Sequence, residues 1–380
     1  MTITKLFKDF SESEKSGGII LILCTIISLI LANTAFGDNY MHLWHSDLGG
    51  QSVEYWINDG LMTIFFLLIG LELEREIYIG ELSKIKDALL PIFAALGGMM
   101  IPAGIYLLLN FGTSTQSGAG IPMATDIAFA LGILSLLGNK VPTSLKVFLT
   151  ALAVIDDLGA IMVIAIFYTK AIIWTNLFIA MGIFVVLIIF NRLKIRNLIP
   201  YLIGGFAMWY FMLHSGVHAT ITGVLLAFAI PFGNGDEKST SYILQHFLHK
   251  PVAFIVLPLF ALANTAIMIN TDLGEIIFQK FSLGISLGLV IGKPVGIFLL
   301  SFLAVKFGIC KLPEDLNWKA IIGVGFLGGI GFTMSIFITL LAFDDSNLQN
   351  DSKITILIAS VIAASIGFVS LKFALKKGNY

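Results

Sequence analysis

The sequence predicts an all-α membrane protein that crosses the bilayer many times. Of its 380 residues, 57% are hydrophobic and only 12% are charged, and the mean hydropathy is +0.93. The apolar residues form long runs, and about 20 of them suffice for one helix to span the hydrocarbon core. Because lipid forces backbone hydrogen bonds to close internally, runs of this length indicate helices rather than barrel strands.

Twelve candidate spans follow one another along the chain. The seventh and eighth are short, but together they are too long for a single span, and we expect a turn between them at 214–216. The twelve runs are 17–36, 57–73, 89–110, 121–137, 147–168, 172–190, 199–213, 216–231, 251–269, 282–305, 320–343 and 354–371.

The distribution of Lys and Arg predicts the orientation. With a cytoplasmic N-terminus, 19 of the 23 basic residues fall in the inner segments, three in the outer loops, and Lys293 inside the membrane. This bias supports twelve spans with both termini cytoplasmic. The first run resembles a signal peptide, but no clear cleavage motif follows it, so we expect a retained helix. No second soluble domain is expected in 1–380.

The outer segment at about 38–56 has two readings. Residues 40–44 and 52–56 are rich in aromatic and β-prone residues, and Gly49-Gly50 lies between them. This pattern fits a β-hairpin whose edge pairs with a second copy of the chain. It fits equally well an ordinary outer loop whose Trp residues anchor at the membrane interface.

Two of the runs look broken. In 121–137, Thr125-Asp126 reads as the cap of a helix that restarts within the membrane. In 320–343, five glycines crowd one stretch before Phe332-Thr333-Met334, although small residues also serve close helix packing. The two runs cross in opposite directions, so repeat-like halves at about 89–168 and 282–371 would form an inverted repeat. Such repeats mark a binding site at the membrane midplane of transporters.

Four charged residues lie deep inside apolar runs: Asp126, Asp156, Asp157 and Lys293. Each costs about 2.5–3.5 kcal/mol in a membrane, so we expect compensation by pairing and by function. Three acids and one base form the electrostatics of a cation site. Asp126 can offset the positive ends of the broken helices and Lys293 their negative ends, a role we prefer over direct ion ligation for both.

Asp156 and Asp157 have a different role, because neighbours on a helix point about 100° apart. One can line an ion cavity while the other meets Lys293. Burial disfavours the charged form of a carboxylate, so the pair would hold protons without a cation and release them when one binds. Na+ or Li+ suits such oxygen ligands, with the Thr125 hydroxyl assisting. The alternative, a static salt-bridge cluster, fits poorly because one lysine cannot neutralise three acids.

Several motifs resemble one family closely. They are Ala124-Thr125-Asp126-Ile127-Ala128-Phe129-Ala130-Leu131-Gly132, Val154-Ile155-Asp156-Asp157-Leu158-Gly159-Ala160, Ile291-Gly292-Lys293-Pro294 and Gly329-Ile330-Gly331-Phe332-Thr333-Met334-Ser335, with Asn58-Asp59-Gly60 and 65–72 in support. Over nearly the whole chain, the sequence is similar to the NhaA family of bacterial Na+/H+ antiporters. Inverted repeats are a property of that family, so they do not support the resemblance independently.

The resemblance implies a multi-pass inner-membrane homodimer that exchanges cytoplasmic Na+ or Li+ for external protons, electrogenically and under pH control. It implies no enzyme activity, no cofactor beyond the transported ions and no nucleic-acid partner. Asp156 and Asp157 would bind the ion and protons, with Asp156 paired to Lys293, and Asp126 and Lys293 would balance the crossing helices.

A cytoplasmic pH-responsive cluster is also implied, with candidates Glu72, Arg75, Gln245, His246 and His249. Gln245 stands where a glutamate is usual, and Glu74 where a basic residue is usual, so the pH set-point is open. The rival interpretations are a solute symporter or uniporter on the same fold, and an ion channel.

Overall fold

The computed structural model describes residues 3–169, 171–269 and 273–375, with the backbone alone for 3–15 and for Asn139. Helices dominate this part of the chain, and its sole β-type pairing is an isolated antiparallel bridge between Asp47 and Ser52. The predicted all-α fold class is confirmed.

The α-helices are α1 (Ile3–Ala32), α2 (Gly37–His45), α3 (Val53–Tyr55), α4 (Met62–Tyr78), α5 (Ile85–Asn110), α6 (Ile127–Ser135), α7 (Thr143–Phe167), α8 (Trp174–Arg192), α9 (Leu198–Leu213), α10 (Ile221–Ala229), α11 (Thr240–Pro251), α12 (Leu257–Asn264), α13 (Leu273–Ile277), α14 (Lys280–Leu287), α15 (Lys293–Lys306), α16 (Trp318–Gly328), α17 (Phe332–Ala342) and α18 (Ser346–Ala374). The 3₁₀ turns are η2 (Glu81–Ser83), η3 (Gln116–Met123) and η4 (Gly138–Lys140), and the π-helical turns are η1 (Trp56–Leu61), η5 (Val252–Val256) and η6 (Gly288–Gly292).

Every one of the twelve predicted runs contains helix, but not every helix is long enough to span a bilayer. Among the described residues, eight helical stretches are long and apolar enough, or ten if each of two bent pairs counts as one span. The seventh and eighth runs, α9 and α10, have 16 and 9 residues and fall short of this length. The molecule is a multi-pass membrane protein with eight to ten spans by this criterion.

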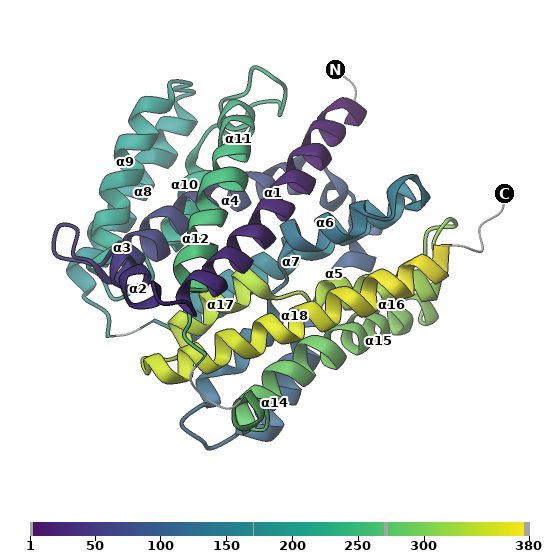
Figure 1. Cartoon of the computed structure of the whole chain (residues 1–380). Helices are drawn as coiled ribbons and strands as arrows, with labels where there is room; N and C mark the ends of the chain where they lie inside the picture. The colour runs from purple at the N-terminus through teal and green to yellow at the C-terminus, as the bar shows by residue number, and fades with distance from the viewer. Residues whose placement is uncertain (1–2, 170, 270–272, 376–380) are drawn as a thin grey trace.

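The helices form two groups that meet around the middle of the molecule. In one group α5 packs along α15 and α16 along α18, while in the other α4 packs along α10 and α8 along α9. Figure 1 shows α18 and α15 at the opposite end of the molecule from α8 and α9, and the view from below separates the same groups. Helix α1 crosses over both α6 and α12.

Glycine pairs allow the α5–α15 contact to be close. A Cβ added at Gly97 of α5 would collide with the carbonyl of Gly296 on α15, and the reverse substitution would collide with the carbonyl of Gly97. The small residues therefore let the two backbones touch, as is common between membrane helices. This contact fixes the helix that carries Lys293.

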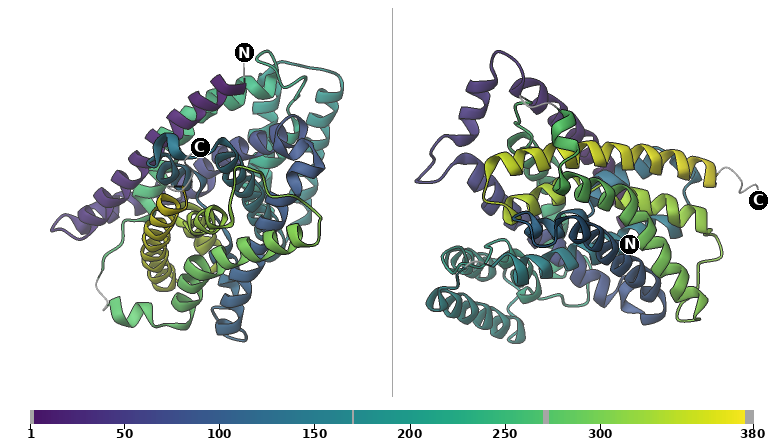
Figure 2. Two further views of the ribbon diagram at one scale, coloured as in Figure 1. Left: turned by 90° about the vertical axis from the view of Figure 1, so that its right-hand side faces the viewer. Right: turned by 90° about the horizontal axis from the view of Figure 1, so that it is seen from below.

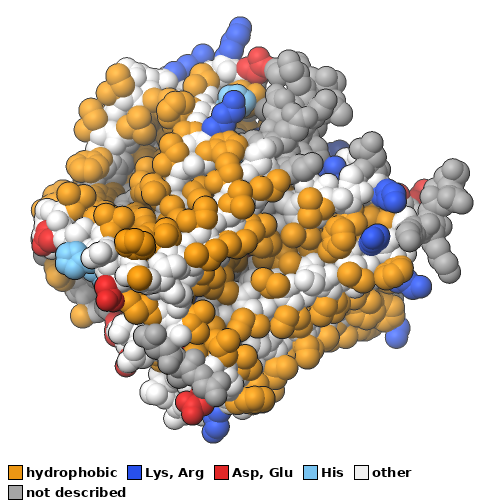
Figure 3. Space-filling model, viewed as in Figure 1, with side chains coloured by type: hydrophobic (Ala, Val, Ile, Leu, Met, Phe, Trp, Pro, Cys, Tyr) orange, Lys and Arg blue, Asp and Glu red, His pale blue; other side chains and the backbone are white. Residues whose placement is uncertain are grey.

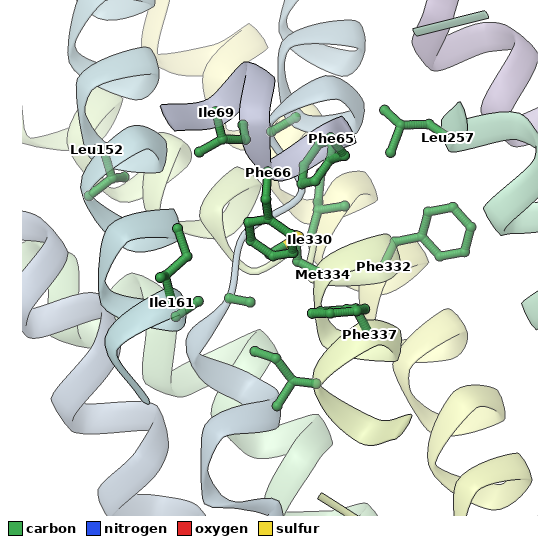
Figure 4. Packing of buried hydrophobic residues seen from close by; sticks show 14 of the residues in the cluster. Phe65, Phe66, Ile69, Leu152, Ile161, Leu257, Ile330, Phe332, Met334 and Phe337 are labelled. Atoms are coloured by element: carbon green, nitrogen blue, oxygen red, sulfur yellow. The ribbon is translucent and has the colours of Figure 1, made fainter. Parts of the chain in front are cut away.

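Aromatic packing joins the two groups at the centre. Phe66 of α4 lies with its ring centroid 5.3 Å from that of Phe337 on α17, and Phe260 of α12 approaches the same ring at 6.5 Å. Figure 4 shows Phe66 and Phe337 side by side, with Ile330 and Met334 next to them. The second broken run is thereby embedded in the core.

The surface in Figure 3 is mostly hydrophobic, as a lipid-facing surface must be. On this face most Lys and Arg side chains lie along the upper and right-hand margins, and most acidic side chains lie along the left and lower left, with a basic side chain also at the lower margin.

The outer segment 38–56 folds differently from the hairpin reading. Residues 40–44, read as a strand, belong to α2, where Trp44 is buried and packs edge-on against Tyr40 at 5.7 Å. The Tyr40 hydroxyl donates to the Leu262 carbonyl, which ties the segment to its own chain. The strand assignment is wrong for 40–44 and also for 52–56, where Val53–Tyr55 form α3 and Trp56 begins η1. Aromatic spacing that suits a strand also suits a short helix buried on one side. The turn at Gly49-Gly50 is present, with both glycines at positive φ.

Glu54 of α3 holds this segment against α18. One carboxylate oxygen lies 3.8 Å from Nζ of Lys353, and the other lies 3.7 Å from Nε2 of His45. The sequence places Lys353 in an outer loop, whereas the structure buries it within α18 at 5% exposure. A buried ammonium requires such a counter-charge.

We predict that Glu54→Gln lowers the free energy of unfolding by roughly 1–3 kcal/mol, because it leaves the Lys353 ammonium buried without its counter-charge. Thermal denaturation of the purified protein in detergent measures this. Glu275→Gln, the same change at an exposed position on α13, is the control. Equal melting temperatures for the two variants would mean that the Glu54–Lys353 contact contributes nothing.

Candidate functional site

Two helix breaks face each other inside the molecule. The first lies between η3, which ends at Met123, and α6, which begins at Ile127. The second lies between α16 and α17, which are bent by 47° at Gly329–Gly331. The backbone N–H of Asp126 in the first break donates to the carbonyl of Ile330 in the second, at 2.7 Å. The two predicted interruptions therefore cross and are bonded directly.

Asp126 caps two helices at once. One carboxylate oxygen accepts from the backbone N–H of Phe129 at 3.0 Å, in the first turn of α6. The other accepts from the backbone N–H of Thr333 at 3.1 Å and from its hydroxyl at 2.5 Å, in the first turn of α17. Both helix starts carry partial positive charge, so one carboxylate placed between them offsets both.

Hydroxyl groups satisfy the remaining polar groups at the crossing. Thr125 donates to the carbonyl of Gly328 at the end of α16, and Ser335 donates to the carbonyl of Ile121 in η3. Ser360 of α18 accepts from the first backbone N–H of α17, that of Phe332. Ser360 was not among the residues predicted for the site. Its one signal in the sequence is that a serine inside the apolar run 354–371 needs a hydrogen-bond partner.

Lys293 pairs with Asp156 in the fully buried interior. Its Nζ lies 2.5 Å from Oδ2 of Asp156 and 2.9 Å from Oγ1 of Thr125. The Thr125 hydroxyl also lies 2.7 Å from the same carboxylate oxygen. Lys293 is 0% exposed and Asp156 is 1% exposed, so this is a desolvated ion pair with a hydroxyl bridging it. The sequence left open which of the two adjacent aspartates meets Lys293, and the family resemblance implied Asp156.

A π-helical turn directly precedes Lys293. Residues 288–292 form η6, and Pro294 follows at the start of α15, where its missing N–H is tolerated. A π turn changes the direction in which the next side chains point, and such turns are frequent at functional sites. The glycines at 288 and 292 allow the turn to press against Pro122 and Pro102. Sequence reasoning did not anticipate this device.

Asp157 stands apart from these pairs. It is 1% exposed, and its Oδ1 is buried without a hydrogen-bond partner among the described residues, as is Oδ1 of Asp156. The side chain lies within electrostatic range of Asp156, Asp126 and Glu72 on the negative side and of Lys293 on the positive side. Buried carboxylate oxygens without donors are what a proton or a hard cation satisfies.

The three buried acids are divided between partners. Asp126 belongs to the helix starts, Asp156 to Lys293, and Asp157 to neither. In the parts of the chain that the structure covers, no three His, Cys, Asp or Glu side chains converge as metal ligands do. The arrangement is thus an ion pair beside a buried carboxyl whose Oδ1 has no described partner.

A second polar cluster lies near the C-terminal end of α4, the helix that also carries Phe66. Glu72 is 8% exposed and lies 3.7 Å from Nδ1 of His249 on α11. Arg75 donates to Glu76 at 3.3 Å, and the second oxygen of Glu76 accepts from the backbone N–H of Glu81. Burial and the nearby carboxylates of Glu76 and Asp87 raise the pKa of Glu81.

The structure brings together only some of the pH-response candidates. Glu72 and His249 are in contact, and Arg75 lies three residues along the same helix with Glu76 as its partner. Gln245 is buried at 8% exposure on α11. His246 is exposed, and its ring lies parallel to that of Tyr242 with the centroids 6.1 Å apart. His246 lies three residues before His249, on the same side of α11, but at its solvent-exposed edge.

Known proteins with similar sequences are Na+/H+ antiporters. The family model described as "Na+/H+ antiporter 1" matches residues 8–371. The chain is 74% identical to the Na(+)/H(+) antiporter NhaA of Flavobacterium psychrophilum over 99% of this chain and 98% of that protein. It is 66% identical to Na(+)/H(+) antiporter NhaA 1 of Flavobacterium johnsoniae, over 99% and 98% of the two chains.

A solved structure shares the fold at low sequence identity. The sodium proton antiporter MjNhaP1 from Methanocaldococcus jannaschii superposes with a TM-score of 0.51, covering 99% of this chain and 95% of that one, at 16% identity. This likeness concerns the fold alone.

Proposed function

The chain belongs to the Na+/H+ antiporter 1 family, and from this premise we propose how its residues carry out the exchange. The protein is a Na+/H+ antiporter of a bacterial membrane. We propose that it exports cytoplasmic Na+ or Li+ and admits external protons, that the exchange is electrogenic, and that cytoplasmic pH regulates it. No cofactor is involved beyond the transported ions.

The observation that carries the mechanism is the pair of buried carboxylate oxygens without donors, one on Asp156 and one on Asp157. In the ion-free state Asp157 holds a proton, and Asp156 is neutralised by Lys293. An entering Na+ takes oxygens from both carboxylates, with the Thr125 hydroxyl already placed against Asp156. The Asp157 proton leaves because the cation replaces it as counter-charge. On the other side two protons, one on each carboxyl, displace Na+. After the site returns to the cytoplasmic side, Asp156 releases its proton and pairs again with Lys293, and Asp157 keeps its own. Two protons thus enter for each Na+ exported, so the cycle moves net charge.

Asp126 and Lys293 support this site without binding the ion. The three hydrogen bonds that the Asp126 carboxylate accepts at the crossing account for its charge as compensation for two helix starts. Lys293 donates to the Thr125 hydroxyl, and that hydroxyl donates to the carbonyl of Gly328 at the C-terminal end of α16. Lys293 is thereby linked to a helix end that carries partial negative charge. Competition between Lys293 and Na+ for Asp156 links the two roles.

The repeat-like halves supply the frame for alternating access. One half consists of α5, the broken run η3–α6, and α7, and the other of α14–α15, the broken run α16–α17, and α18. In both, a broken helix lies between two long ones, and a buried charge sits on a long helix beside the break. We propose that the halves, about 89–168 and 282–371, are inverted repeats that rock against each other.

We place the protein in the inner membrane with both termini cytoplasmic. The bias of Lys and Arg toward the segments on one side supports this orientation. It puts the ends of α4 and α11, with Glu72, Arg75, Gln245 and His249, on the cytoplasmic side. We propose that this cluster senses cytoplasmic pH, with the Glu72–His249 contact as its central element and His246 at its exposed edge.

Transport in everted vesicles tests the function. Membranes from cells that express the protein but lack their own antiporters are energised until the interior is acid, and salts are then added outside. Antiport predicts collapse of the pH gradient on adding NaCl or LiCl. Collapse only with an organic solute would indicate a symporter or uniporter, and a current without proton movement would indicate a channel.

We further propose that the protein is a homodimer joined through the outer segment 38–56. The support is that large apolar side chains are exposed there, outside the apolar belt: Leu43 is 54% and Leu48 is 60% exposed. A second copy of the chain would cover them. The segment itself is held to its own chain by Tyr40 and Glu54, so the contact needs no exchange of elements.

We predict that Leu43→Ser combined with Leu48→Ser weakens dimerisation on the order of tenfold or more, since each leucine contributes about 1.5–3 kcal/mol when fully buried. Exchange activity should be retained because the midplane site is untouched. Dissociation on serial detergent dilution measures the effect, and Gln51→Ser at an exposed position on the same turn is the control. If the double variant stays dimeric to the same dilution as the control, the segment is not the interface.

A further inference from the structure

Glu74 is a buried acidic side chain that the exchange mechanism does not use. It is 4% exposed, and its Oε2 is buried with no hydrogen-bond partner within the described ranges of the chain. Its helix also carries Glu72, Arg75 and Glu76, all of which have partners. A buried carboxyl that is left alone beside engaged neighbours requires its own account.

The neighbours of Glu74 on α4 define what it faces. Four residues before it, Gly70 lies against Val224 and Ala227 of α10. Four residues after it, Tyr78 stacks against Phe232, just beyond the end of α10, with the ring centroids 4.9 Å apart. Residues four apart share one face of a helix, so Glu74 lies over the last turn of α10.

Helices α4 and α10 run in the same direction, because contacts advance together along both. Gly223 lies against the backbone of Thr63, near the start of α4, and Phe232 lies against Tyr78 at its end. The carbonyl ends of both helices therefore converge at Glu74. These ends carry partial negative charge and disfavour a nearby anion.

No described cation compensates for this. Arg75 pairs with Glu76, and His249 lies against Glu72. The described ion pairs of Arg75 and His249 thus leave Glu74 without a cation of its own. In the loop after α10, Asp236 accepts from Ser239, and this hydrogen bond lowers the pKa of Asp236, which stays ionised at the surface.

We propose that Glu74 carries a proton at neutral pH and is a proton-binding carboxyl of the cytoplasmic side, separate from Asp156 and Asp157. A carboxylate here would be desolvated, unpaired and opposed by two helix ends, whereas the neutral acid escapes all three costs. When the cytoplasm becomes alkaline, the proton passes to the solvent and a negative charge appears near Glu72. Glu72 acts electrostatically on Asp157, so this step would tune the exchange site; that consequence alone rests on the proposed function.

Infrared spectroscopy of the purified protein tests the protonation without using transport. Protonated carboxyl groups have their own infrared band at neutral pH. The component from Glu74 should be absent in Glu74→Gln and should move to a different frequency in Glu74→Asp. Glu237→Gln, the same change in the exposed loop after α10, should leave the spectrum as it is. If Glu74→Gln and Glu237→Gln both match the parent, Glu74 is ionised and the proposal is wrong.

The pH dependence of thermal stability gives an independent readout. The unfolded chain releases the Glu74 proton above pH ~4.3, whereas the folded protein retains it, so this residue makes stability fall as pH rises. Glu74→Gln has no proton to lose. Its melting temperature should match that of the parent at pH ~4 and exceed it by a margin that grows toward pH ~8. A margin that is constant with pH, or equal to that of Glu237→Gln, would overturn the proposal.

These two measurements separate the inference from the transport model. Both can succeed in a protein whose exchange mechanism differs from the one proposed, and both can fail while everted vesicles show normal Na+/H+ exchange.

Discussion

Asp157→Asn is expected to reduce the initial rate of Na+-driven pH-gradient collapse on the order of 100-fold. The amide keeps the shape of the side chain, but it can neither release a proton nor offer an anionic oxygen. Losing a charged partner in a desolvated site costs about 3 kcal/mol, and every 1.4 kcal/mol corresponds to a factor of ten. Asp87→Asn, at an exposed position in the first turn of α5, is the control and should be neutral.

Both Asp157→Asn and Asp156→Asn should lose exchange, but their effects on thermal stability should differ. Oδ1 of Asp157 is buried without a hydrogen-bond partner among the described residues, so replacement of the side chain by the neutral amide should leave the melting temperature unchanged or higher. Asp156→Asn, also inactive, should lower it, because Lys293 then loses the carboxylate at 2.5 Å. If Asp157→Asn exchanges Na+ near the parent rate, the assignment of the site is wrong.

Lys293→Gln is expected to have the largest effect on stability, a loss of about 3–5 kcal/mol. Removing one member of a fully buried ion pair leaves the other charged and unpaired. Chemical or thermal denaturation in detergent measures this against Lys319→Gln, an exposed lysine on α16. A loss no larger than that of the control would mean that Asp156 is already protonated in the parent.

Lys293→Arg then separates two roles of the same residue. Arginine keeps the positive charge but holds its proton at any physiological pH. If Lys293 only compensates the crossing helices and pairs with Asp156, this variant should retain most of the exchange and its response to membrane potential. If the lysine proton is itself carried in the cycle, the variant should bind Na+ but exchange poorly or become electroneutral. We expect the first result.

Much of the fold follows from patterns that the membrane imposes. Uncharged runs must be helical in lipid, and a Thr-Asp or a group of glycines within such a run must be accommodated by a break, so both interruptions were predictable. The segment 38–56 escapes this constraint because it lies between two apolar runs, where aromatic spacing fits more than one structure. Residues 40–44 are accordingly helical where a strand was one of two readings.

The midplane site was predictable to the level of residues but not of contacts. A buried charge must have a partner, so Lys293 was expected to meet one of the two adjacent aspartates, and the family resemblance implied that this one is Asp156. That Asp126 would serve α17 through Thr333, or that Ser360 would assist, depends on which helices cross. The π turn before Lys293 left no signal apart from its glycines. The exposure of His246 depends on how α11 packs against α4, which the sequence alone does not show.

The central claim is that Na+ and protons compete for the same carboxyl groups, Asp156 and Asp157. Titration calorimetry of Na+ binding to the purified protein, in two buffers that differ in their heat of protonation, tests this most directly. We predict that the heat of Na+ binding differs between the two buffers, because the released protons are taken up by the buffer. Li+ should give the same difference. Asp157→Asn should bind Na+ more weakly and lose the difference. Na+ binding with the same heat in both buffers, or proton release that persists in Asp157→Asn, would contradict the account.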